Sequence, residues 1–446
     1  MKSSSVSPTP WLQRIGLGRP ELRAWVLYDW ANSAFVTTIV AAIFPIYFSS
    51  VAAATLSPAV ATARFALATT IACAIIAVLA PGLGAIADVR PIKKQMLGMC
   101  LAIGVATTGA MFFIQRGDWL FACILFILAD IGAAGSFVFY DSLLPHIANE
   151  EEMDRVSTAG YAFGYLGGGL LLTLNLFWLQ KPEVFGIPDA TAAARLSFLS
   201  VALWWLIFSV PLFWFVAEPS SHIKEEERLP RVNPFRTALS RLRELRSFPP
   251  AFRLLLAFLL YNDGIATIIR MAAIYGTELG IAQGSLIAAI LLVQFIGLPC
   301  TLLFGQLAGW IGAKRAVLLT LLIYTIVSVV GYLMQTAWHF YAVALLIGTV
   351  QGGSQALSRS LFASMIPRHR SAAFFALFAI CEKFAGIFGP AIFSVTALVA
   401  DSSRSAVLAI IAFFLAGGWL LAGVNVAEGQ RLARMAEEKE SFSATR

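Results

Sequence analysis

Long apolar stretches recur along the whole chain and constrain the fold more than any other feature. A helix needs about 20 apolar residues to cross the hydrocarbon core of a bilayer, and a helix satisfies its own backbone hydrogen bonds there. Hydrophobic residues make up 59% of the 446 residues and charged residues 13%, which is too little charge to cover a soluble protein of this size. We therefore predict an all-α membrane protein with twelve transmembrane helices, at residues 25–48, 63–87, 95–115, 119–144, 157–180, 195–217, 251–275, 283–308, 314–335, 338–364, 371–398 and 404–426.

The lysine and arginine residues indicate how these helices are oriented. Most of the 32 basic residues fall in the two tails and in the connections that share the side of the tails. Because basic residues of membrane proteins collect in the cytoplasm, we expect both termini to be cytoplasmic and the protein to lie in a bacterial inner membrane. The same bias accounts for the net charge of +7 without a nucleic-acid partner.

A long basic segment divides the predicted helices into two sets of six. Its prolines and charged residues are typical of a linker that lies on the inner membrane surface. We therefore predict five parts: a cytoplasmic tail (1–24), a six-helix bundle (25–217), a cytoplasmic linker (218–250), a second six-helix bundle (251–426) and a second cytoplasmic tail (427–446).

The two predicted bundles share three landmarks that lie about 220–230 residues apart. The stretch Gly84–Lys94 corresponds to Gly305–Arg315, and Tyr28-Asp29 corresponds to Tyr261-Asn262-Asp263, while Pro145 and Pro367 end corresponding helices. These landmarks indicate a duplicated six-helix unit. Repeats of this kind are typical of transporters whose substrate site lies near the membrane midplane, between the halves.

The first landmark resembles the loop signature of the major facilitator superfamily, in which a glycine precedes an acid and a basic cluster. Its second copy has Gly309 where the acid would stand. The strings YDWANSAF (28–35), GYAFGYLGG (160–168), YNDGI (261–265) and QGGSQALSRS (351–360) resemble the vacuole effluxer family, the autophagy-related amino-acid effluxers of fungi and their bacterial relatives. The resemblance implies a twelve-helix facilitator fold and transport of a small solute, with amino-acid export established for some fungal members.

Ionisable residues inside the predicted helices are the main candidates for function. A charge at the centre of a membrane helix costs about 2.5–3.5 kcal/mol on insertion scales, and desolvation favours the neutral form of a carboxyl group, which makes buried acids candidate proton carriers. By depth, Asp130, Asp263, Glu382 and Lys383 fall near the midplane, Asp141 and Arg359 in the cytoplasmic third, Asp29 about one turn inside, and Arg270 near the outer end.

Asp263 carries the most specific local pattern. Tyr261 and Asn262 precede it, and Thr267 and Arg270 follow on the same helical face. We predict a substrate or proton site here, and an ion pair between helices is the alternative.

The tenth predicted helix carries a continuous polar stripe. Its spacing places all the members on one helical face, which must contact a cavity or another helix. The resemblance to facilitators favours the cavity. The members are Gln351, Ser354, Gln355, Ser358 and Arg359.

The adjacent residues Glu382 and Lys383 point about 100° apart on a helix. We therefore expect one of them to face the cavity while the other pairs with Asp130 or Asp263.

Two further predictions concern the cytoplasmic side. Asp141 and Arg359 form either an inner gate or a simple charge pair. Asp29 is either a cavity acid or an interfacial aspartate held by Asn32 or by backbone.

The superfamily resemblance implies that Asp88 approaches the start of the eleventh helix and latches the two halves in one state. A helix N-terminus favours an anion by about 0.3–1 kcal/mol, enough to bias a two-state balance. Close packing of helices is also predicted at Gly160, Gly164 and Gly168. The predicted conformational gate comprises Gly84, Asp88, Arg90, Asp141, Gly305 and Gly309.

These patterns predict a secondary active transporter that works by alternating access and uses protons, and the resemblance implies export of an amino acid or related metabolite. An amino acid is zwitterionic, and the buried acids and bases offer partners for both of its charges. Export of peptides or drug-like amphiphiles, or sensing without flux, are the alternatives. We expect no enzymatic activity, metal or cofactor, since HExxH, GxSxG and ATP-binding motifs are absent from the sequence. The expected partners are a small-molecule substrate, the lipid bilayer and protons, with the chain as a monomer.

Overall fold

The computed structural model describes residues 10–219, 234–278, 283–385 and 407–444, and every regular element in these ranges is a helix. In the first half of the chain these are α1 (Pro10–Arg14), α2 (Pro20–Ala34), η1 (Phe35–Ala42), α3 (Ile43–Tyr47), η2 (Phe48–Ala52), α4 (Pro58–Val89), α5 (Lys93–Ala110), η3 (Met111–Phe113), α6 (Trp119–Ile147), α7 (Met153–Gln180), η4 (Pro182–Phe185) and α8 (Ala190–Phe215). In the second half they are α9 (Pro234–Leu245), α10 (Pro249–Glu278), α11 (Gln283–Ile311), α12 (Ala313–Tyr332), α13 (Ala337–Ser364), η5 (Arg368–Arg370), α14 (Ser371–Phe384), α17 (Ile411–Ala422) and α18 (Val426–Ala444).

The apolar stretches fold as long helices, as the sequence predicts. Within the described residues nine helices are long and apolar enough to cross a membrane, or ten if the bent pair α17 and α18 is one span. Helix α13 is long enough but does not reach the hydropathy of the nine. The eleventh and twelfth predicted spans lie partly outside the described residues.

Several helices extend beyond the predicted spans. The first span begins at Pro20, within the predicted tail, and continues to Ala52 through the π-helical segments η1 and η2. The predicted linker contains helix α9, and the predicted C-terminal tail is the helix α18. Both helices are too polar to span a bilayer, so hydropathy could not reveal them.

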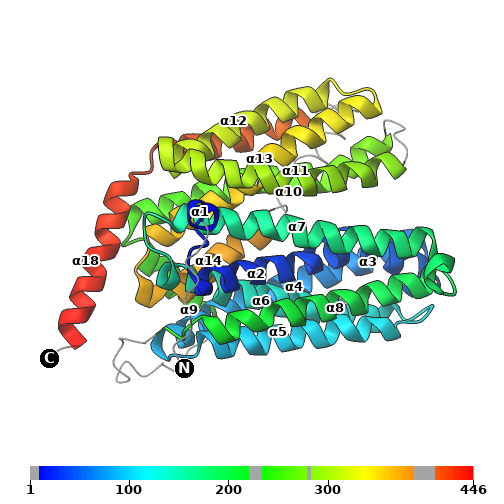
Figure 1. Ribbon diagram of the computed structural model, residues 1–446, viewed down its shortest axis with the longest axis horizontal. Helices are drawn as coiled ribbons and strands as arrows, with labels where there is room; N and C mark the ends of the chain where they lie inside the picture. The colour runs from blue at the N-terminus through cyan, green and yellow to red at the C-terminus, as the bar shows by residue number, and fades with distance from the viewer. Residues whose placement is uncertain (1–9, 220–233, 279–282, 386–406, 445–446) are drawn as a thin grey trace.

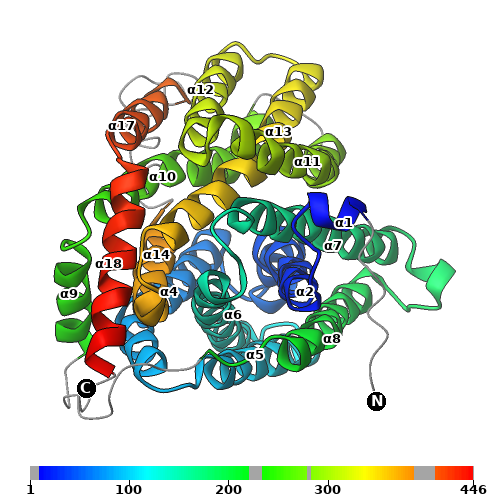
Figure 2. The same ribbon diagram turned by 60° about the vertical axis from the view of Figure 1, so that its left-hand side comes forward.

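Figures 1 and 2 show two neighbouring groups of helices, one formed by α2 to α8 and the other by α10 to α13 with α17. Helix α7 packs against α11 and α13 of the second group. Helix α14 packs mainly against α4 and α6 of the first group, although it follows α13 in the chain. Both described chain ends, with α9 and α18, lie at one end of the long helices, which we call the α18 end (Figure 1).

Glycines allow the helices of the two groups to approach closely. A Cβ atom on Gly84 of α4 would lie 2.6 Å from the carbonyl oxygen of Ala372 in α14. A Cβ atom on Gly305 of α11 would lie 2.1 Å from the Thr158 hydroxyl of α7. These corresponding glycines of the repeat therefore serve two corresponding contacts, α4 with α14 and α11 with α7.

Candidate transport site and inner gate

The Arg359 side chain is held at the junction of four helices. Arg359 lies on α13, and only 1% of it is exposed. Its Nη1 atom donates to Asp141 of α6 at 3.0 Å, and Nη2 donates to Asp29 of α2 at 3.2 Å. Its Nε and Nη2 atoms donate to the hydroxyl and carbonyl oxygens of Ser157 in α7, each at 2.9 Å. One residue of the second group is therefore bonded to three helices of the first.

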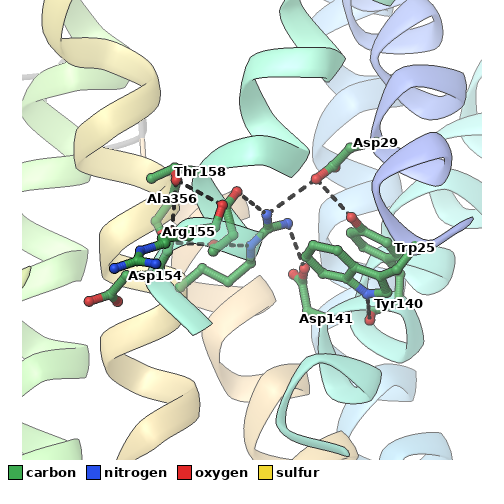
Figure 3. A network of polar contacts seen from close by, with 10 residues as sticks. Trp25, Asp29, Tyr140, Asp141, Asp154, Arg155, Thr158 and Ala356 are labelled. Atoms are coloured by element: carbon green, nitrogen blue, oxygen red, sulfur yellow. Dashed lines mark hydrogen bonds and ion pairs between the residues drawn. The ribbon is translucent and has the colours of Figure 1, made fainter. Parts of the chain in front are cut away.

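Aromatic rings complete this Arg359 cluster. The guanidinium carbon lies 4.5 Å from the ring centre of Tyr161 and 4.8 Å from that of Trp25. The Tyr140 hydroxyl donates to Asp29 at 2.8 Å, and the Tyr140 ring stacks on Trp25 (Figure 3). A buried cation requires this degree of pairing, because removing one partner of a buried ion pair leaves an uncompensated charge.

The cluster gives the partners of two residues predicted on the cytoplasmic side. The predicted pairing of Asp141 with Arg359 is present. Tyr140 and Arg359 hold Asp29, so the alternative in which Asn32 or backbone holds it was wrong. Asn32 instead donates to Ser136 at 3.4 Å. Depth counted along the sequence could not reveal that Asp29 is buried between helices.

The absence of a side chain at Gly160 makes room for the Arg359 cluster. A Cβ atom there would lie 2.3 Å from Asp29 Oδ2 and 2.9 Å from Arg359 Nη2. Further along α7, Cβ atoms on Gly164 and Gly168 would meet Ser33 Oγ at 2.5 Å and the Thr37 methyl carbon at 2.9 Å. The predicted small-residue face of α7 is thus the face that packs on the first span.

A second cluster joins α4 to the start of α14. The Asp88 carboxylate accepts hydrogen bonds from the N–H groups of Ala372 at 3.0 Å and Ala373 at 2.8 Å. Lys93 Nζ lies 2.9 Å from Asp88, and both side chains are buried. The approach of Asp88 to this helix start, implied by the superfamily resemblance, is present.

Sequence reasoning missed the remaining contacts of Lys93. Its Nζ atom also donates to Ser371 Oγ at 2.7 Å and lies 3.1 Å from His146 Nε2. The Glu218 carboxylate accepts from the backbone N–H groups of Lys93 at 2.7 Å and Lys94 at 2.9 Å. These partners are distant in sequence and follow no period, so no local pattern could have predicted them.

Asp130 and Lys383 form an ion pair between α6 and α14. Lys383 Nζ lies 2.7 Å from Asp130 Oδ1. The Asp130 side chain is 5% exposed, whereas that of Lys383 is 30% exposed. The neighbouring Glu382 is close enough to Arg359 and Asp141 for electrostatic interaction. The predicted pairing of one of these two residues with Asp130 is therefore present, and the residue is Lys383.

The structure brings only part of the predicted Asp263 site together. Tyr261, Asn262 and Asp263 of α10 are all buried. Tyr261 shares a hydrogen bond of 2.5 Å with Ser358 of α13. Thr267 donates to the backbone oxygen of Asp263 at 2.7 Å. The side chain of Arg270 lies outside the described residues, so the predicted face cannot be traced beyond Thr267.

The polar stripe of α13 changes character along its length. Gln351 and Gln355 are partly buried, and Ser354 donates to the backbone oxygen of Gln351. Ser358 and Arg359 are buried and contact other helices, which is the interhelical alternative.

Of the other predicted gate residues, Arg90 is exposed. A Cβ atom on Gly309 would meet only the Arg155 guanidinium, at 3.8 Å. Within the described residues, no group of three or more histidine, cysteine, aspartate or glutamate side chains is placed to hold a metal ion.

Comparison with known protein families identifies this arrangement. The family model "Vacuole effluxer Atg22 like" matches residues 18–434. The chain belongs to this family. The uncharacterized MFS-type transporter YxiO of Bacillus subtilis is 36% identical over 403 residues, which cover 90% of this chain and 94% of that relative. Autophagy-related protein 22-1 of Aspergillus fumigatus is 26% identical over 334 residues. The matched region covers 67% of this chain and about half (53%) of that relative.

Solved structures show the same fold in the major facilitator superfamily (MFS). The human organic anion transporter MFSD10 (TETRAN) superposes with a TM-score of 0.69 at 15% identity, over 90% of this chain and 99% of that one. The transporter FucP in its outward conformation gives 0.65 at 13% identity, over 91% and 98%. The family match and the 36% identical relative make this Atg22-like protein an integral, multi-pass membrane protein and an MFS-type transporter, with a small molecule as its substrate.

Proposed function

We propose that this transporter exports a small zwitterionic solute, an amino acid or related metabolite, by proton-coupled alternating access. In this proposal it has twelve transmembrane helices in two six-helix bundles, 25–217 and 251–426, and acts as a monomer without enzymatic activity. Both termini lie in the cytoplasm of a bacterial cell, in its inner membrane. The α18 end is then cytoplasmic, and the Asp88 and Arg359 clusters close the inner gate.

The Asp130–Lys383 ion pair carries the proposal. Asp130 lies on a helix of the first half of the repeat and Lys383 on a helix of the second half. Lys383 is the more exposed partner. A bound amino acid replaces the pair with two new ones, its carboxylate against Lys383 and its ammonium against Asp130. Glu382, next in sequence to Lys383, interacts electrostatically with Arg359, so in this proposal substrate binding and gate opening act on one helix.

Counterflow in proteoliposomes tests the proposal. The full-length protein is reconstituted, and uptake of a panel of labelled amino acids is measured at two pH values. Wild type, Asp130→Asn, Lys383→Met and Asp263→Asn are compared, with Asp118→Asn as the control because Asp118 lies in the turn at the opposite end from α18. We expect saturable, pH-dependent flux in wild type and control, and loss of flux in Asp130→Asn and Lys383→Met.

The double variant Asp130→Asn/Lys383→Met separates binding from a structural ion pair. It removes both charges and leaves neither one unpaired. If the pair only stabilises the fold, the double variant regains flux, whereas it stays inactive if the charges bind substrate. Absence of flux for every amino acid, from wild-type protein shown to be folded, would end the amino-acid assignment.

A further inference from the structure

The start of α12 forms a pocket on the α18 end of the second helix group. The pocket has a volume of 480 Å³ and is lined by the end of α11, the start of α12 and the turn between α17 and α18. Lys314, Arg315 and Asn425 are its polar side chains. Its lining therefore offers two cations and no carboxylate.

The corresponding place in the first helix group shows what this construction binds. There Lys94 Nζ donates to the carbonyl oxygens of Phe213 and Val216 at the end of α8. The backbone N–H groups at the start of α5 hold the Glu218 carboxylate, which follows directly after α8. A helix start, a lysine and the end of the sixth span thus form an anion site, and a carboxylate of the chain itself occupies it.

The second group repeats this construction without the carboxylate. Lys314 Nζ donates to the carbonyl oxygens of Ala422 and Val424 at the end of α17, at 2.7 and 2.8 Å. The N-cap residue of α12 is Gly312, which has no side chain to cap the helix start. The residues that follow α17 are Gly423, Val424, Asn425 and Val426, where the first group has Glu218. The pocket occupies the place of the missing acid.

Unused donors face this place. A lysine ammonium has three N–H donors, and the two carbonyl bonds of Lys314 use two of them. Arg315 is exposed, and no described carboxylate forms an ion pair with it. The Arg253 guanidinium lies against Gly423 of the same turn, since a Cβ atom on Gly423 would be 2.3 Å from Arg253 Nη2. Two cations therefore line the pocket, and a third lies against the turn that forms one of its walls.

We propose that this pocket binds the phosphate group of a phosphate ester. Phosphate oxygens match backbone N–H groups at a helix start and the forked donors of arginine. Trp310 and Trp419, which are 83% and 71% exposed, lie close in sequence to the pocket lining, and exposed indoles are typical of the membrane interface. Their position favours the headgroup of an anionic lipid as the source, and a soluble phosphate ester is the other source with the same chemistry.

Thermal unfolding of the full-length protein in detergent measures binding, with native mass spectrometry to count adducts. The ligands are dioleoylphosphatidylglycerol, dioleoylphosphatidylcholine, glycerol 3-phosphate and inorganic phosphate. Arg315→Gln removes the exposed cation of the pocket lining. Asn425→Asp places a carboxylate in the pocket and keeps a good helix cap, because Asn425 Oδ1 accepts from the Glu428 N–H of α18. Arg116→Gln, an exposed arginine at the opposite end, is the control.

We expect phosphatidylglycerol to bind, and each pocket variant to weaken its binding about tenfold. Arg315→Gln loses one charge-assisted hydrogen bond, and Asn425→Asp adds a carboxylate that repels the phosphate, while the control binds as wild type does. Binding of glycerol 3-phosphate or inorganic phosphate with the same dependence assigns the site to a soluble ester. Equal binding by wild type and both pocket variants, or no binding of any ligand, would overturn the proposal. An unchanged melting temperature without ligand shows that the variants are folded.

Discussion

Asp88→Asn tests the contact that joins α4 to α14. The first four N–H groups of a helix have no partner within the helix, so the protection of the Ala372 and Ala373 amides depends on Asp88. Asparagine has a similar shape but one acceptor oxygen and no charge. It can keep one neutral bond to α14, and it leaves the buried Lys93 ammonium without its counterion.

The size of the effect follows from these losses. Removing one partner of a buried ion pair costs about 3–5 kcal/mol, and the contacts of Lys93 with His146 and Ser371 remain. We therefore expect the state in which α4 contacts the start of α14 to lose about 3 kcal/mol of stability, which shifts the equilibrium between the closed and open contact about a hundredfold. Hydrogen exchange of the full-length protein, followed by mass spectrometry, should show exchange at the start of α14 that is faster by this factor.

Two further variants make the experiment decisive. Asp118→Asn changes a carboxylate that accepts from the Gln115 N–H at 2.9 Å in an exposed turn, and it should leave exchange in α14 unchanged. Asp88→Asn/Lys93→Met removes the unpaired ammonium as well. The amides at the start of α14 should therefore exchange more slowly in this double variant than in Asp88→Asn. Wild-type exchange rates in Asp88→Asn would refute the reasoning, because the Asp88 contact would then contribute nothing to closure.

Three more predictions follow from the same contacts. Gly84→Ala should lower the melting temperature and speed exchange at the start of α14, because its Cβ atom would lie 2.6 Å from backbone, whereas Gly82→Ala on the same helix meets nothing within 4 Å and should be neutral. Arg359→Lys should destabilise the protein by about 3 kcal/mol in denaturant unfolding, since an ammonium cannot reach both carboxylates and one is left buried and unpaired; a value near zero would contradict the role of the forked side chain. Glu150→Gln should change stability by less than about 1 kcal/mol, because its ion pair with Arg434 of α18 is exposed, and a larger loss would show that this contact holds α18 in place.

Much of the fold could be predicted because hydropathy acts locally. Each apolar run contains its own reason to be a helix in a bilayer, and the positions of the runs need no knowledge of tertiary contacts. The repeat added long-range information, since Gly84 and Gly305 could be recognised as equivalent before either contact was known. Hydropathy could not predict the polar helix α18. Its signal was helix propensity and spacing, such as the Glu428–Arg431 pair at i, i+3.

The candidate site was predictable only in its charges. The cost of a buried charge singled out Asp130, Arg359 and Lys383, and it required partners for them. It could not reveal that the rings of Trp25 and Tyr161 would enclose Arg359. Aromatic residues are common in every apolar span, so nothing in the sequence distinguishes a ring that faces a guanidinium from one that faces lipid.

Helix α14 links the three clusters on which the proposed mechanism depends. Its first turn binds Asp88 through two amides, and its last turn holds Lys383 against Asp130 and Glu382 near the Arg359 cluster. A rigid helix cannot release one end without moving the other. Exchange of the Asp130–Lys383 pair for substrate would therefore shift α14 and strain the Asp88 contact, so saturating substrate should speed exchange at the start of α14 in wild type. The same substrate should have no effect there in Lys383→Met, and an equal effect in both proteins would show that α14 does not carry the coupling.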